Sequence, residues 1–272
     1  MTADAYADTY AMGHTPDERR RLSLQDRVFA PHTENLFRQA GIATGHRVID
    51  AGCGTGDTTR LLARMVGPEG TVIGVDQDPS SLETARASAA AEGLANVRFV
   101  QADVRETTPG EPVDVLAGRA LLMHQRGPGR TLAHMAQWVR PGGIIAFQDF
   151  AMGRAGSLPE VPLMSRWVRW VSAALRQAGG DPEFGDSMPA LFRDAGLTDP
   201  GFAAVRIAGD ADSLLPEYLT QTARSLSPLI VAAGAATAAE IARDSAQALA
   251  AQARERQAML FSQDLVSVWA RL

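Results

Sequence analysis

A glycine-rich segment in the first quarter of the chain constrains the fold more than any other feature of its 272 residues. Val48 and Ile49 are β-branched and apolar, which is typical of a strand buried on both faces, and glycine then occupies every second position over 52–56. Glycine permits a sharp turn and lets a ligand approach the backbone closely. Because apolar residues recur at helical spacing over 58–66, the sequence predicts a strand, a tight turn and a helix whose free N–H groups face a ligand.

Composition excludes several kinds of chemistry. All 26 basic residues are arginines, so there is no lysine amine for a Schiff base, a pyridoxal phosphate site or a Walker-type phosphate loop. The net charge of −5 argues against general binding to nucleic acid or to an anionic membrane. The single cysteine, Cys53, cannot form an internal disulfide, and no apolar run reaches the length of a transmembrane helix. We therefore expect a cytoplasmic monomer or homodimer that acts on a small molecule, not on nucleic acid or a membrane.

Acidic residues end three successive predicted strands. Asp50 ends the first strand, Asp76 ends a second strand over 71–76, and Asp103 lies near the end of a third over 97–104. In an open parallel sheet the carboxyl ends of the strands share one edge, where ligands bind. Asp76 follows the glycines at the spacing where an acid accepts hydrogen bonds from the ribose hydroxyls of a nucleotide cofactor.

The rest of the chain continues the alternation of strands and helices. Pro31 is expected to separate two short helices before the first strand, because proline interrupts helical hydrogen bonding. Further strands are predicted at 113–120, 140–149, 202–207 and 265–272, and further helices at 163–178, 187–195, 213–225 and 237–259.

The segment Val48–Asp57 resembles motif I of the class I S-adenosylmethionine-dependent methyltransferases, and the turn Arg140–Gly143 is also similar to that family. The resemblance is strong over 48–150 and weak over the first forty residues. It implies an α/β fold with a Rossmann-like sheet of seven strands, parallel except for an antiparallel C-terminal strand. It also implies a helical lid at 1–40 and a methyltransferase domain at 41–272, with helical lid insertions at about 151–186 and 210–260.

The resemblance implies S-adenosyl-L-methionine as the cofactor and assigns residues to its parts. Asp50 would face the cationic methionine portion, Asp76 would bind the ribose, and Asp103 would accept a hydrogen bond from the adenine amino group. The full set of expected cofactor contacts is Gln25, Asp50, Gly52, Cys53, Gly54, Gly56, Asp76, Gln77, Ala102, Asp103, Val104 and Arg119.

Methyl transfer from a sulfonium releases a neutral leaving group, so positioning of the reactants can supply most of the acceleration, at ~7–11 kcal/mol. His124, after the fourth strand, is the best candidate for a base, and Asp149, at the end of the fifth, could orient an acceptor hydroxyl or amine. We expect no metal, because Asp149 has no further carboxylates nearby in the sequence. Expected substrate contacts are Tyr10, His14, Gln148, Trp167 and Trp170, and the aromatic ones could equally fill the core.

The acceptor is expected to be a small, apolar or aromatic metabolite, methylated on oxygen, nitrogen or carbon. Enzymes that methylate amino groups of nucleic acids carry an Asn/Asp-Pro-Pro-Tyr/Phe run where this chain has Gly118–Leu121. One alternative function is an NAD-dependent oxidoreductase, whose G-x-G-x-x-G turn would need a glycine at the position of Asp57. The other is a protein that binds the cofactor without transferring a methyl group.

Overall fold

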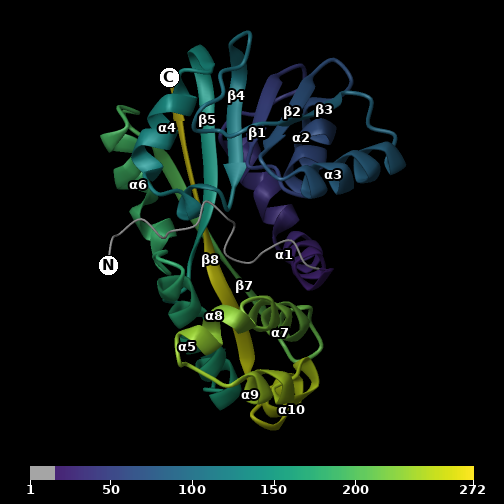
Figure 1. Cartoon of the computed structure of the whole chain (residues 1–272), viewed down its shortest axis with the longest axis vertical. Coiled ribbons are helices and arrows are strands. Elements are labelled where there is room, and N and C mark those ends of the chain that lie inside the picture. Colours follow the sequence, from purple (N-terminus) through teal and green to yellow (C-terminus); the bar gives the residue numbers. More distant parts are fainter. Residues whose placement is uncertain (1–15) are drawn as a thin grey trace. The chain divides into compact units, whose positions relative to one another are not determined.

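The computed structural model describes residues 16–272 (Figure 1). Its elements, in chain order, are α1 (Pro16–Gln39), β1 (Arg47–Ala51), α2 (Asp57–Val66), β2 (Thr71–Asp76), α3 (Pro79–Ala91), β3 (Val97–Gln101), β4 (Val113–Arg119), the 3₁₀ turn η1 (Leu122–His124), α4 (Pro128–Ala136), β5 (Val139–Ala151), β6 (Gly156–Leu158), α5 (Pro162–Gln177), α6 (Phe184–Asp194), β7 (Gly201–Gly209), α7 (Leu215–Ser225), α8 (Ser227–Ala232), α9 (Ala238–Arg243), α10 (Ala246–Glu255) and β8 (Met259–Arg271).

The strands form one eight-stranded sheet in the order β3-β2-β1-β4-β5-β8-β6, and β7 also pairs with β8. The pairs β1–β2, β1–β4, β2–β3 and β4–β5 are parallel, whereas β6 and β8 are antiparallel. The predicted α/β fold, with a mostly parallel sheet and an antiparallel C-terminal strand, is confirmed. The additional strand, β6, has three residues and lies in a segment for which we predicted helix.

Contacts divide the chain into two compact units. The sheet unit comprises residues 29–149, 185–204 and 265–272, and it contains β1 to β4 with helices α2, α3 and α4. The helical unit comprises the described residues 16–28 together with 150–184 and 205–264, and its helices α5, α7, α8, α9 and α10 contact one another (Figure 1). No helix among the described residues combines the length and apolar character needed to cross a membrane.

Helix α2 shows why the predicted strand, turn and helix form. Leu61, Leu62 and Val66 recur at helical spacing and are at most 5% exposed. They belong to the same buried cluster as Val48 of β1 and Val72 of β2. Strands covered in this way carry apolar residues at most positions, and burial of each large side chain contributes about 1.5–3 kcal/mol.

Our prediction that Pro31 separates two helices is wrong, because α1 continues through it. The apolar spacing does not break there: Val28 and Phe29 before the proline and Leu36 and Phe37 after it are all buried. An interior proline costs a helix about 3 kcal/mol, which the burial of several large side chains outweighs.

The segment predicted as one helix over 237–259 is helical as far as residue 255, but it is divided into two short helices, α9 and α10. Strand β8 then begins at Met259, six residues before the strand that we predicted. The break falls at Asp244, whose carboxylate lies 2.8 Å from the Arg166 guanidinium. The next residue, Ser245, caps α10 by accepting the N–H of Ala248 at 3.2 Å. Serine in a cap competes with helix continuation, since its side chain satisfies a free N–H group.

We predict that Leu62→Ala lowers the free energy of unfolding by ~2–5 kcal/mol, because it leaves a cavity in the cluster between α2 and the sheet. Urea unfolding followed by circular dichroism measures this change. Leu158→Ala is the control, because Leu158 is 71% exposed, and we expect it to change stability by about 0.5 kcal/mol or less. Equal effects of the two substitutions would contradict the assignment of the core.

Candidate functional site

In the turn between β1 and α2, the backbone is open to approach at Gly54 and tightly packed at Gly56. Gly54 has φ +51°, in the left-handed region, and a Cβ placed there would meet no atom within 4 Å. Gly56 has φ +79°, and a Cβ there would lie 2.9 Å from the Cβ of Ala85. A side chain at Gly56 would therefore push α3 away, whereas the face over Gly54 leaves room for a ligand to approach the backbone.

Asp76, at the end of β2, holds this turn in place. Its Oδ2 accepts the N–H of Gly54 at 2.8 Å, and its Oδ1 accepts the N–H of Asp78 at 2.9 Å. The carboxylate is half-buried. Because each carboxylate oxygen has two lone pairs, Asp76 can hold the turn and still accept hydrogen bonds from ligand hydroxyls.

Asp50 is a buried acid next to the turn. Its Oδ2 accepts the hydroxyl of Thr59 at 2.6 Å, while its Oδ1 has no hydrogen-bond partner among the described residues. Burial raises the pKa of Asp50 to about 7, although the Thr59 hydrogen bond and the charge of Arg119 lower it. The Arg119 guanidinium donates to the Thr33 hydroxyl at 3.2 Å. Burial, with the charges of Asp50 and Asp76, also raises the pKa of the Cys53 thiol, so Cys53 is not a reactive thiolate.

The residues expected around adenine follow β2 and β3, which are neighbours in the sheet. Gln77 is exposed, Ala102 donates its N–H to the carbonyl of Asp76 at 3.0 Å, and Val104 is buried. Asp103 is paired with Arg105 through Nε to Oδ1 at 3.0 Å and Nη2 to Oδ2 at 2.5 Å. The hydrogen bonds from Arg105 lower the pKa of Asp103, so this side chain is a carboxylate.

The end of β5 carries two buried polar side chains without partners. Gln148 is aligned with Arg119 of β4, and none of its amide atoms has a partner among the described residues. Asp149 is fully buried, and neither carboxylate oxygen has a hydrogen-bond partner in that part of the chain. Burial raises the pKa of Asp149 well above its usual value, and the nearby N–H groups of Leu122 and Met123 lower it less. Burial thus favours the protonated form of Asp149, and the two N–H groups favour the carboxylate.

The remaining predicted residues belong to η1, to the helical unit or to the part of the chain that is not described. His124 ends η1 and is half-buried. Gln25 belongs to the helical unit, where its Oε1 accepts from Arg21 at 2.6 Å. Trp167 and Trp170 of α5 are 2% and 4% exposed in the same unit, with the Arg166 guanidinium 5.6 Å from the ring centre of Trp170. Two predicted contacts, Tyr10 and His14, lie outside the described residues.

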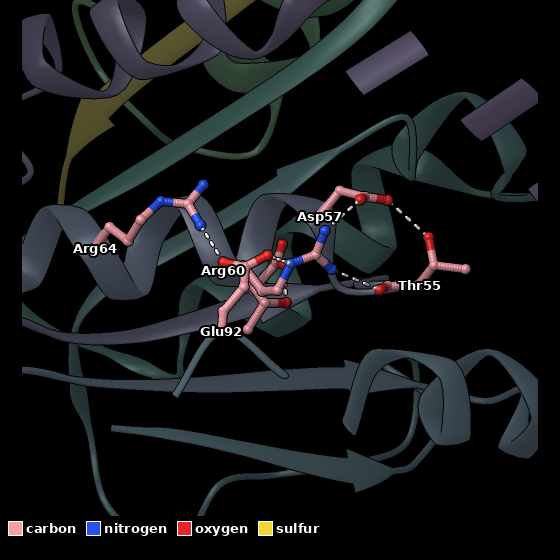
Figure 2. A network of polar contacts seen from close by, with 7 residues as sticks. Thr55, Asp57, Arg60, Arg64 and Glu92 are labelled. Carbon is pink, nitrogen blue, oxygen red and sulfur yellow. Dashed lines mark hydrogen bonds and ion pairs between the residues drawn. The ribbon is translucent and has the colours of Figure 1, made fainter. Parts of the chain in front are cut away.

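The structure adds a polar network that the sequence interpretation missed (Figure 2). Arg60 of α2 donates to Asp57 at 2.8 Å, to Glu92 at 2.7 Å and to the carbonyl of Thr55 at 3.2 Å. The Thr55 hydroxyl donates to the other oxygen of Asp57 at 2.7 Å, and Arg64 donates to Glu92 at 2.5 Å. The spacing of Asp57 and Arg60, three residues apart on a helix, was the available signal for part of it.

The site has features that fit a cationic ligand with an anionic end. Helix α2 begins at Asp57, and its N-cap residue, Gly56, makes no side-chain cap hydrogen bond, so the first N–H groups of the helix can bind an anion. Beside them, the orphaned oxygen of Asp50 can accept from a cationic group. No group of three or more His, Cys, Asp or Glu side chains within residues 16–272 is arranged to hold a metal ion.

Known proteins are similar to this chain over the part that contains the glycine-rich turn. A family model described as a methyltransferase domain matches residues 42–178. The chain is 34% identical over 132 residues to trans-aconitate 2-methyltransferase of Methylobacterium nodulans, covering 48% of each protein. It is 34% identical over 157 residues to the aklanonic acid methyltransferase DauC of Streptomyces sp. strain C5, covering 57% of this chain and 69% of DauC. The matches span about half the length of the first two curated relatives.

A solved structure shares the fold at low sequence identity. Coclaurine N-methyltransferase, bound to N-methylheliamine and S-adenosylhomocysteine, aligns with a TM-score of 0.55 and 14% identity, covering 89% of this chain and 72% of that enzyme.

We predict that Asp50→Asn flattens the pH dependence of stability in the ligand-free protein. Because the folded-state pKa of Asp50 is raised to about 7 from 3.8, the folded protein holds a proton that the unfolded chain releases. The free energy of unfolding of the wild-type protein therefore falls as pH rises from about 4 to about 7, at up to about 1.4 kcal/mol per pH unit. Urea unfolding of both proteins across this range tests the prediction, and parallel profiles would show that Asp50 does not titrate there.

Proposed function

The chain belongs to the class I S-adenosylmethionine-dependent methyltransferases, and on this premise we propose that it transfers a methyl group to a small organic acceptor. Its cofactor, S-adenosyl-L-methionine, supplies a methyl group activated by a sulfonium. The observation that carries the proposal is the open face over Gly54, with Asp76 at one side and the orphaned oxygen of Asp50 nearby.

We propose that the residues of the sheet edge divide the cofactor among them. Asp76 would accept from the ribose hydroxyls, and the backbone of the turn from Gly52 to Gly56, including Cys53, would line the methionine portion. Asp50 and Arg119, of opposite charge, would face its ammonium and carboxylate groups respectively. Gln77, Ala102, Asp103 and Val104 would border the adenine ring. Asp103 would have to share its carboxylate with Arg105, which already engages both oxygens.

For the acceptor we propose a small apolar or aromatic molecule of bacterial specialised metabolism. Two of the relatives are named for organic acids, trans-aconitate and aklanonic acid. These names support a small acceptor. Trp167 and Trp170 provide buried aromatic surface in the helical unit. The proposed lid would comprise residues 1–40, including Tyr10, His14 and Gln25, and the segments at about 151–186 and 210–260.

The chain's part in the reaction is chiefly to hold the acceptor in line with the methyl group and to exclude water. His124 would accept a proton from an acidic acceptor group. Asp149, whose pKa is raised by burial, would form a hydrogen bond that orients an acceptor hydroxyl or amine, and Gln148 would add an amide contact. These roles need no metal ion.

Two measurements separate this proposal from the alternatives. Calorimetric titration with S-adenosylmethionine and with NAD distinguishes a methyltransferase from an oxidoreductase, which Asp57 at the third glycine position already disfavours. Formation of S-adenosylhomocysteine in the presence of candidate organic acids and phenols distinguishes methyl transfer from cofactor binding alone. Tight binding of NAD without binding of S-adenosylmethionine would overturn the proposal.

We predict that Asp76→Ala weakens S-adenosylmethionine binding at least about tenfold, because hydrogen bonds to a charged group are worth about 1.5–3 kcal/mol. The same change frees the N–H of Gly54, so the turn is also less ordered. Isothermal titration measures the affinity, and Asp194→Ala, at the exposed end of α6, is the control. Unchanged affinity in Asp76→Ala would remove the ribose assignment.

We predict that His124→Gln lowers kcat by about 10²–10⁴-fold, the usual contribution of a general base, and leaves the affinity for the cofactor unchanged. Steady-state kinetics gives kcat, and isothermal titration gives the affinity. A loss of cofactor affinity with an unchanged kcat would instead make His124 a packing residue.

A further inference from the structure

We propose that two buried threonines, Thr33 and Thr59, are positioning residues for the amino-acid end of the cofactor. Each makes a hydrogen bond with one of two oppositely charged side chains: Thr33 with Arg119, and Thr59 with Asp50. The inference rests on the proposed function, which assigns Arg119 to the carboxylate of the cofactor and Asp50 to its ammonium group. All four residues belong to the sheet unit.

The sheet places Asp50 and Arg119 on the same face. Side chains alternate between the two faces along a strand, so Asp50 shares the face of Val48, and Arg119 shares the face of Ala117. Val48 and Ala117 belong to the buried cluster that also contains residues of α1 and α2. Because Asp50 is aligned with Ala117 on the neighbouring strand, the two charged side chains lie on the face that these helices cover.

Thr59, in α2, orients the carboxylate of Asp50. Thr59 is fully buried, and its hydroxyl donates to Oδ2 of Asp50 at 2.6 Å. The other oxygen, Oδ1, is buried and has no hydrogen-bond partner among residues 16–272. Burial raises the pKa of Asp50, and the hydrogen bond from Thr59 opposes this by favouring the carboxylate. Thr59 therefore fixes one oxygen of Asp50 and leaves the other for a cationic group of a ligand.

Thr33, in α1, orients the guanidinium of Arg119. Thr33 is also fully buried, and its hydroxyl oxygen accepts from Nη1 of Arg119 at 3.2 Å. A guanidinium carries five N–H donors in a planar fork, so a contact through Nη1 can fix the plane of the fork while other donors bind a carboxylate. An arginine side chain that is oriented before the ligand arrives loses less conformational freedom on binding.

Thr131 supplies a matched control. It is a buried threonine of the sheet unit, but it belongs to α4 and not to the two helices that hold the charged side chains. Valine keeps the branched shape of threonine and removes the hydroxyl. Thr131→Val therefore removes a buried hydroxyl from the same unit without removing a hydrogen bond to Asp50 or Arg119.

The test compares three ligands by isothermal titration. S-adenosylhomocysteine carries a carboxylate and an ammonium group, its decarboxylated analogue keeps only the ammonium group, and 5′-methylthioadenosine has neither. We expect Thr33→Val to weaken the binding of S-adenosylhomocysteine about fivefold or more and that of the other two less than about twofold, because only the carboxylate depends on Arg119. Thr59→Val should weaken S-adenosylhomocysteine and its decarboxylated analogue alike, about fivefold or more, and 5′-methylthioadenosine less than about twofold.

The control and the serine variants decide whether the hydroxyls are responsible. Thr131→Val should leave all three affinities as in the wild-type protein, and Thr33→Ser and Thr59→Ser, which keep the hydroxyl, should retain the affinity for S-adenosylhomocysteine. Thr33→Ala and Thr59→Ala replace either valine variant that does not fold. Equal weakening of all three ligands would overturn the proposal and make the threonines braces of the fold, and unchanged binding of S-adenosylhomocysteine would overturn it as well.

Double-mutant cycles test whether each threonine acts through its charged partner. If Thr33 acts through Arg119, adding Thr33→Val to Arg119→Met should weaken S-adenosylhomocysteine less than about twofold further, and the same holds for adding Thr59→Val to Asp50→Asn. Additive losses would overturn the proposal. If the wild-type protein bound all three ligands equally, the inference would fail alone, whereas binding of none of them would defeat the proposed function itself.

Discussion

The hydrogen bond from the N–H of Gly54 to Asp76 is the interaction on which the cofactor edge depends. Glycine loses more conformational freedom on folding than any other residue, so a turn with glycine at every second position is costly to order. Something outside the turn must therefore select one conformation. Asp76 does so from β2, Arg60 does so from α2 through the carbonyl of Thr55, and the close packing of Gly56 on Ala85 fixes the exit into the helix. The turn is ordered by its neighbours, so a ligand that contacts it meets a prepared surface.

The sequence alone could predict those elements in which apolar residues recur at a regular spacing and are buried. The strand at 71–76 and the helix at 58–66 could be predicted from the spacing of their apolar residues, because each is stabilised by burying those residues against a neighbouring layer. The errors share a different cause. The helix through Pro31 depends on how deeply the apolar residues on either side of the proline are buried in the folded chain, and β6 is three residues long, too short to show a repeating pattern. Strand β6 forms by pairing with β8, and no pattern within its own three residues indicates that a partner strand exists.

The candidate site shows the same division. Asp50 and Asp76 could be placed at the sheet edge from strand ends alone, and the parallel pairing of β1 with β2 brings them there. Their chemical states could not be predicted, because they depend on neighbours. Asp103 is a carboxylate fixed by Arg105, two residues away, whereas Asp50 has a pKa near 7 because it is buried without an ion-pair partner. A chain whose basic residues are all arginines favours such planar, two-point pairs.

The buried aspartates fall into two groups, one paired with arginines and one not. Asp264 lies between Arg154 and Arg206, and Asp244 is paired with Arg166, so both charges are compensated by the helical unit. Asp50 and Asp149 are as deeply buried, yet neither forms an ion pair with a described residue, and the nearest donors to Asp149 are the backbone N–H groups of Leu122 and Met123. A buried acceptor without a partner, such as Oδ1 of Asp50, costs about 1–3 kcal/mol. Both residues stand at the carboxyl ends of parallel strands, the edge where such sheets bind ligands, and this position is the basis of our proposal that they face the cofactor and the acceptor.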